Sequence, residues 1–157
     1  MDSPWKDSNV IAWTQVLLAS YRQRLGRALF EPTPDASPDA IARALYEAPF
    51  VIVSHGTQAD PILNYGNRTA IALWETTWDD ITQMPSRLTA EQPNREVRQQ
   101  MLDRVQRDGY IDDYRGVRIS ATGRRFEIDD AVVWNLSDAD DKFCGQAATF
   151  NRWRFLK

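Results

Sequence analysis

The stretch DPILNYGNRTAIALWE, residues 60–75, decides the fold because it joins a turn, a short apolar strand and a helix without spare residues. Asp60 and Pro61 favour a turn, and ILNYG has the apolar character of a short strand. Asn67 has a side chain that can cap a helix, and the helix after it turns Trp74 toward the core. The polar residues of the stretch therefore have local structural roles, and Tyr65 and Trp74 remain as candidates for recognition.

Strands are predicted on both sides of this junction. FVIVS (residues 50–54) is an apolar run that can form a hairpin with ILNYG, and three longer strands are predicted at residues 110–120, 124–137 and 142–155. ATG and DADD join these three as turns. The middle strand alternates with a period of two, which predicts one buried face that carries Phe126, Ile128, Val132, Trp134 and Leu136.

Helices are predicted in the first half and before the meander. An amphipathic helix begins near Asp7 or Ser8 and runs to about residue 30, and residues 10–29 carry its apolar stripe. A proline-rich loop and a short helix at residues 39–48 follow. A longer helix begins at Pro93 and Asn94 and ends at Gly109. We therefore expect an α+β protein with a five-stranded antiparallel sheet, helices on one face and an N-terminal amphipathic helix.

The composition is that of a globular domain with a single core. The chain has 157 residues, 43% hydrophobic, with a net charge of −3, which disfavours a nucleic-acid partner. The one cysteine, Cys144, forms no intramolecular disulfide and fits a reducing compartment. The absence of a long apolar run argues against a membrane span, and we expect a cytoplasmic protein.

Several segments, kept in order, resemble the MEKHLA domain family, a PAS-related module. They are SYRQRLGRAL in the first helix, SHGTQADPILNYGNRTAIALWE, MPSR at residues 84–87, GYIDDYRGVRISATGRRFEI at residues 109–128, and VWNL followed by GQAATFNRW. The resemblance implies one PAS-like domain over residues 1–157, with an N-terminal helical extension (1–48) and a core (49–157). It also implies a non-catalytic sensory or regulatory module that binds a small molecule or a protein partner, including a homodimer through residues 10–29.

The cofactor stays unknown at this point. A light-sensing flavin site needs a cysteine in a helix motif, whereas Cys144 lies beside the last predicted strand, although Gln146 is similar to a glutamine near the flavin of relatives. His55 lies in a predicted turn, which does not suit a haem ligand. One histidine and one cysteine do not make a zinc site without several carboxylates.

A binding pocket is the preferred hypothesis for the site. Large aromatic side chains with a few polar groups are typical of small-molecule sites, although most such residues in proteins are core. Arg118 is the strongest single candidate, because an inward guanidinium on an apolar strand can hold a carboxylate. The candidates are Tyr65, Trp74, Trp78, Met84, Tyr114, Arg118, Trp134, Gln146 and Phe150.

Two alternatives stay open. One is an interaction module with a filled core, which associates through an exposed apolar stripe on the first helix. The other is a small cone-shaped α+β enzyme that uses a buried carboxylate. Asp130 is its candidate acid, because its parity matches the predicted inward residues and burial would shift its pKa. The alternative for Asp130 is a purely structural role, in a salt bridge to Arg118 or Arg125.

Overall fold

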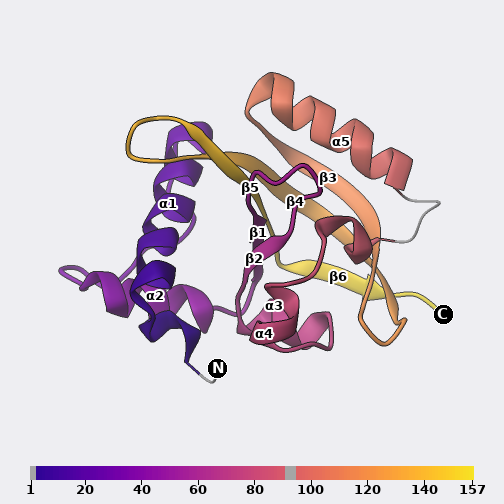
Figure 1. Ribbon diagram of the computed structural model, residues 1–157, viewed down its shortest axis with the longest axis horizontal. Helices are drawn as coiled ribbons and strands as arrows, with labels where there is room; N and C mark the ends of the chain where they lie inside the picture. The colour runs from indigo at the N-terminus through magenta and orange to yellow at the C-terminus, as the bar shows by residue number, and fades with distance from the viewer. Residues whose placement is uncertain (1–2, 91–94) are drawn as a thin grey trace.

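The computed structural model describes residues 3–90 and 95–157, which form an antiparallel sheet between two layers of helices (Figure 1). The strands lie in the order β2-β1-β5-β4-β3, and β6 pairs with β4. The predicted last strand is interrupted at Asn151, so the sheet has six strands instead of five. The strands are β1 (Val51–His55), β2 (Leu63–Gly66), β3 (Tyr110–Ile119), β4 (Arg125–Ser137), β5 (Phe143–Phe150) and β6 (Arg152–Phe155).

The N-terminal helices cover one face of this sheet, which we call the rear face. They are η1 (Pro4–Lys6), α1 (Ser8–Leu25) and α2 (Pro38–Tyr46). Asp7 caps α1 by accepting from the amide of Asn9 at 2.8 Å, as predicted. The helix ends earlier than residue 30, because Gly26 takes the left-handed conformation at φ 73°.

The other face, which we call the front face, is covered by α3 (Arg68–Leu73), η2 (Ser86–Thr89) and α5 (Arg95–Asp108), and α4 (Trp78–Ile81) lies beside the edge strand β2. Gly109 ends α5 with φ 87° and donates its amide to the carbonyl of Val105 at 2.7 Å, in agreement with the predicted stop. The predicted start of this helix at Pro93 and Asn94 lies outside the described residues. Helices therefore lie on both faces, because the N-terminal extension returns to the sheet.

The sheet separates the core into a front and a rear cluster, and a bulge in β4 changes which of its side chains join each one. Tyr114 of β3 pairs with Ala131, but Gly116 pairs with Ile128, so β4 has one extra residue between these pairs. Asp130 lies in the bulge with a positive φ of 50°. Beyond it the strand reverses its parity. Phe126 and Ile128 face the front with Ala131 and Val133, whereas Val132, Trp134 and Leu136 face the rear cluster, so the single buried face predicted for this strand is wrong.

Asn67 fastens the junction that begins at Asp60. Its side-chain oxygen accepts from the amides of Ala70 at 3.1 Å and Ile52 at 3.2 Å, and its amide donates to the carbonyls of Phe50 at 2.8 Å and Leu45 at 3.2 Å. The predicted cap of α3 is thus confirmed. The same side chain also ties α2 and β1 to that helix, and this position fixes where Trp74 enters the front layer.

Candidate functional site

A cavity lies on the front face, between the sheet and the helices that cover it. Its volume is about 60 Å³. Strands β1 to β5 supply most of the wall, and α5, η2 and the end of α3 supply the rest. The large and polar side chains of the wall include Trp74, Met101, Tyr114, Arg118, Gln146 and Phe150.

Arg118 brings a positive charge into this wall. The residue is 7% exposed, and its Nη1 donates to the carbonyl of Val117 at 3.0 Å. The guanidinium also lies 5.2 Å from the ring centroid of Tyr114, which is within the range of a cation–π contact. Within residues 3–90 and 95–157, no carboxylate forms a salt bridge with Arg118, and the proposed bridge to Asp130 is absent. The charge is therefore buried without a counter-charge from these residues.

Gly116 explains how Tyr114 reaches this position. Tyr114 and Arg118 lie on the same face of β3, with Gly116 between them. A Cβ atom placed on Gly116 would overlap Oη and Cζ of Tyr114. The ring therefore lies across the bare backbone of Gly116 and approaches Arg118, so a glycine is required here for steric reasons.

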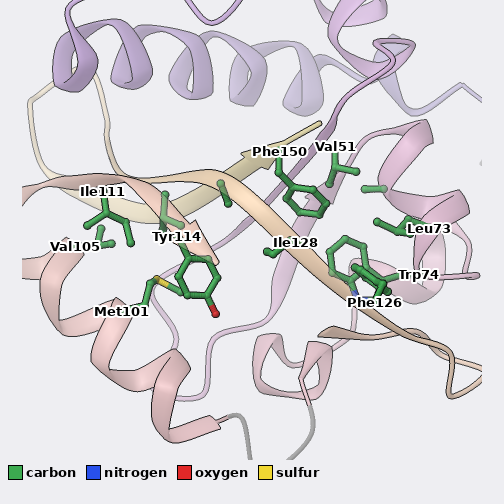
Figure 2. Close-up of a cluster of buried hydrophobic side chains, with 13 residues drawn as sticks. Val51, Leu73, Trp74, Met101, Val105, Ile111, Tyr114, Phe126, Ile128 and Phe150 are labelled. Atoms are coloured by element: carbon green, nitrogen blue, oxygen red, sulfur yellow. The ribbon is translucent and has the colours of Figure 1, made fainter. Parts of the chain in front are cut away.

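Trp74 closes another part of the wall. Its ring makes edge contacts with Phe126 at 5.2 Å and Phe150 at 6.2 Å between centroids. Figure 2 shows Trp74 and Phe126 on one side of Ile128, and Tyr114 on the other. The indole Nε1 is buried and has no hydrogen-bond partner among the described residues. Two residues of the wall thus carry, as far as the described parts of the chain go, a neutral donor without an acceptor and a cation without a carboxylate partner.

A larger groove adjoins the cavity on the outside. Its volume is about 710 Å³, and it shares His55, Leu102 and Gln146 with the cavity wall. Gln146 donates from Nε2 to Oδ1 of Asn135 at 3.2 Å, and Asn135 donates to the carbonyl of Val105 in α5 at 3.3 Å. The shared residues place the groove at the end of the cavity formed by β5 and α5, where a ligand would enter.

The structure separates the nine candidate residues into groups. Trp74, Tyr114, Arg118, Gln146 and Phe150 line the cavity. Tyr65, Trp78 and Trp134 instead belong to the rear cluster with α1, and Met84 is half-buried after α4 and lies in neither that cluster nor the cavity wall. The nine residues therefore do not surround one cavity.

The rear aromatics have structural contacts of their own. Trp134 donates from Nε1 to the carbonyl of Leu17 at 3.3 Å and makes an edge contact with Tyr21 at 4.9 Å. Tyr65 makes an edge contact with Trp78 at 5.6 Å, and burial raises the pKa of its hydroxyl. The bulge in β4 is the reason that Trp134 faces the rear.

Several wall residues were not among the nine candidates, and Met101, Ile128 and Val133 are examples. The predicted alternation placed Ile128 on the buried face of the strand and Val133 on the opposite one. The parity change at the bulge therefore hid Val133, which faces the same side as Ile128. Met101 could have been identified, because it belongs to the apolar stripe of the predicted helix before Gly109.

The carboxylate proposed for an enzyme does not lie in the cavity. The side chain of Asp130 is 70% exposed and pairs with Arg152 at 3.4 Å. This position contradicts the enzyme hypothesis in the form that relied on Asp130. Among the described residues, no cluster of histidine, cysteine, aspartate and glutamate could hold a metal ion, and none of the helices described is long and apolar enough to cross a membrane.

Comparison with known proteins identifies relatives of both sequence and fold. The model of the family described as "MEKHLA domain" matches residues 11–155. The homeobox-leucine zipper protein ATHB-14 of Arabidopsis thaliana is 26% identical over 139 residues, which are 87% of this chain and 16% of that protein. The chain thus spans about one sixth of the length of this relative.

Two solved structures show the same fold at low sequence identity. The PAS domain of a protein from Colwellia psychrerythraea has a TM-score of 0.61 at 14% identity, over 73% of this chain and 92% of that one. The LOV domain of the blue-light activated histidine kinase from Erythrobacter litoralis has a TM-score of 0.56 at 16% identity, over 70% of this chain and 98% of that one. The predicted PAS-like α+β fold is confirmed.

The cavity does not fit the flavin considered from the sequence. Sites for molecules of this size have volumes of roughly 300–1,000 Å³, whereas this cavity has about 60 Å³. Cys144 packs against the rear cluster, on the other side of the sheet from the cavity, and burial raises the pKa of its thiol. The arrangement therefore lacks both the space for an isoalloxazine ring and a thiol beside it.

Proposed function

We propose that this chain, which belongs to the MEKHLA domain family, is a sensory or regulatory module that binds a small molecule in the front cavity. The observation that carries this proposal is the buried guanidinium of Arg118, which faces a cavity and lacks a counter-charge within the described residues. No catalytic step is proposed.

Burying the charge of Arg118 costs free energy. A buried ion needs a partner and hydrogen bonds to offset the loss of its hydration. Arg118 has one carbonyl bond and the face of Tyr114, which satisfy a small part of its five N–H donors. A bound molecule with acceptor oxygens would satisfy the others, so the wall favours a ligand that enters from the groove.

Two hydrogen-bonded connections would carry the effect of a ligand to the helices. Ser54, at the cavity wall, accepts from the indole Nε1 of Trp13 in α1 at 2.8 Å. Gln146 is connected through Asn135 to the backbone of α5. A ligand that moved β1 or β5 would therefore change the packing of a helix on each face, where a partner could detect it.

The experiment is native mass spectrometry with an absorbance spectrum on freshly purified protein, followed by a thermal-shift screen. We expect either a co-purifying small molecule or stabilisation by compounds that carry an acceptor group. Arg118→Gln should abolish the effect, and Arg107→Gln, which removes an exposed charge on the outside of α5, should preserve it. A protein that purifies without a bound molecule and is stabilised by no compound would contradict the proposal.

A protein partner is the second candidate, and the exposure of Phe143 favours it. This side chain is 58% exposed at the groove, where an aromatic ring is costly to leave in water. If the groove binds a protein, Phe143→Ser should weaken the complex and leave the unfolding midpoint unchanged. An unchanged affinity would exclude the groove as the contact.

The predicted homodimer through residues 10–29 would need a different surface of α1 from the one predicted. Leu17 and Tyr21 are buried in the rear cluster, and Val10 and Trp13 pack against it. An interface on this helix must therefore use outward positions such as Ala19. Light scattering on Ala19→Arg tests it, because a dimer through that surface should dissociate and a dimer through any other should persist.

A further inference from the structure

The cavity wall contains two different unmatched donors, and together they describe the ligand more closely than the charge alone. Arg118 requires a negative group, because its cation has no carboxylate partner in the described parts of the chain. Trp74 is 3% exposed and its Nε1–H has no acceptor within residues 3–90 and 95–157, so it requires a neutral or charged oxygen. A ligand that satisfies both needs a carboxylate and one further acceptor.

The other side chains of the cavity wall determine how polar the rest of the ligand can be. Met101, Ile128, Val133 and Phe150 contribute apolar surface to the cavity, and Figure 2 shows Met101 and Tyr114 together at the side nearer α5. Additional charged groups on the ligand would be buried against these side chains at a high cost. The ligand body is therefore small and apolar, and it carries one negative charge.

The cavity volume limits the size. About 60 Å³ is available, and roughly 10–15 Å³ of cavity volume is enough for one water molecule. The space is thus sufficient for roughly four to six non-hydrogen atoms. Tyr114 contributes to this limit, because its ring lies over Gly116 and occupies the side of the cavity next to Arg118.

We infer that the ligand is a short-chain carboxylate with a second acceptor oxygen, of the 2-oxo or 2-hydroxy acid class. The carboxylate binds Arg118, and the second oxygen accepts from Nε1 of Trp74. This inference rests on the proposed function and names the ligand class for the same cavity. Tyr114 is a positioning residue, which orients the guanidinium of Arg118 through its ring face.

Isothermal titration calorimetry with three probes of equal size tests the inference. Pyruvate has the charge and the second oxygen, butyrate has the charge alone, and pyruvamide has the second oxygen without the charge. All three contain the same number of non-hydrogen atoms. We expect pyruvate to bind about 10- to 100-fold more tightly than pyruvamide, since hydrogen bonds to charged groups are the strong ones, and about tenfold more tightly than butyrate.

Two variants assign each preference to one side chain. Arg118→Gln should remove the difference between pyruvate and pyruvamide, and Trp74→Phe, which keeps an aromatic ring, should remove the difference between pyruvate and butyrate. Arg107→Gln, the surface control, should change neither. Circular dichroism on each variant establishes that it is folded, and Trp74→Phe keeps the test decisive if Arg118→Gln unfolds.

The possible results separate the ligand class from the function. Equal affinities for pyruvate and pyruvamide, or preferences that persist in both variants, overturn the ligand class. If another molecule co-purifies or stabilises the protein while none of the three probes binds, the ligand class is wrong and the sensory function stands. If no molecule binds by any of these measurements, both fail.

Discussion

Asn67 is the side chain whose loss should destabilise this fold most specifically. It is fully buried and makes four hydrogen bonds that join α2, β1 and α3. Asn67→Ala removes all four and leaves two amides and two carbonyls without these partners. At about 1 kcal/mol for each bond, with a further cost for the buried groups left unsatisfied, we expect the free energy of unfolding to fall by about 3–5 kcal/mol.

Urea denaturation followed by circular dichroism measures this loss, and two further variants control it. Thr77→Ala removes the single bond from the exposed cap of α4 to the amide of Asp80 and should cost about 1 kcal/mol. Asn67→Asp keeps the two accepted bonds but replaces the two donated ones with repulsion between oxygen atoms. It should therefore destabilise far more than a cap exchange alone.

The comparison of Asn67→Ala with Thr77→Ala separates hydrogen bonding from packing at the junction. If Asn67→Ala costs no more than Thr77→Ala, the junction is fastened by packing, and the four bonds contribute little beyond an ordinary cap. The comparison requires that the slope of the unfolding free energy against urea concentration is the same in each variant. A changed slope would indicate that the unfolded or the native state differs.

Three other positions give separate tests. Gly116→Ala should displace the ring of Tyr114 and lower the unfolding free energy by about 1–3 kcal/mol, with a changed near-ultraviolet dichroism spectrum; an unchanged spectrum would contradict this account. The hydroxyl groups of Ser120 and Thr122, at the β3–β4 turn, donate to the Glu75 carboxylate and lower its pKa. The stability that these bonds contribute is therefore fully present above the ordinary pKa of 4.5 and is lost as the pH falls through the lower pKa of the folded state. Glu75→Gln should therefore destabilise the protein at pH 7, and in urea titrations this difference should shrink below pH 4.5; a constant difference would argue against the charge. Asp130→Gly should be tolerated, whereas Asp130→Val should cost about 1–2 kcal/mol because φ is positive there; equal thermal midpoints for the two would refute the strain argument.

The predictions for the junction that begins at residue 60 are confirmed because they depend on short-range interactions. The hairpin of β1 and β2, the cap at Asn67 and the stop at Gly109 depend on residues a few positions apart, and each is present in the structure. The predicted alternation of side chains between the two faces of β4 is wrong from Asp130 onward. One inserted residue leaves the composition of a strand unchanged, yet it turns every later side chain to the opposite face.

For the candidate site, the sequence by itself determined the residue types and the strand that holds Arg118, together with the PAS-like order of elements. The tertiary structure decided which aromatics share a cavity with it. Tyr65, Trp78 and Trp134 pack in the rear cluster because the N-terminal helices return to the sheet and the bulge rotates β4. Local periodicity contains no information on either event, since both are set by contacts between residues far apart in the chain.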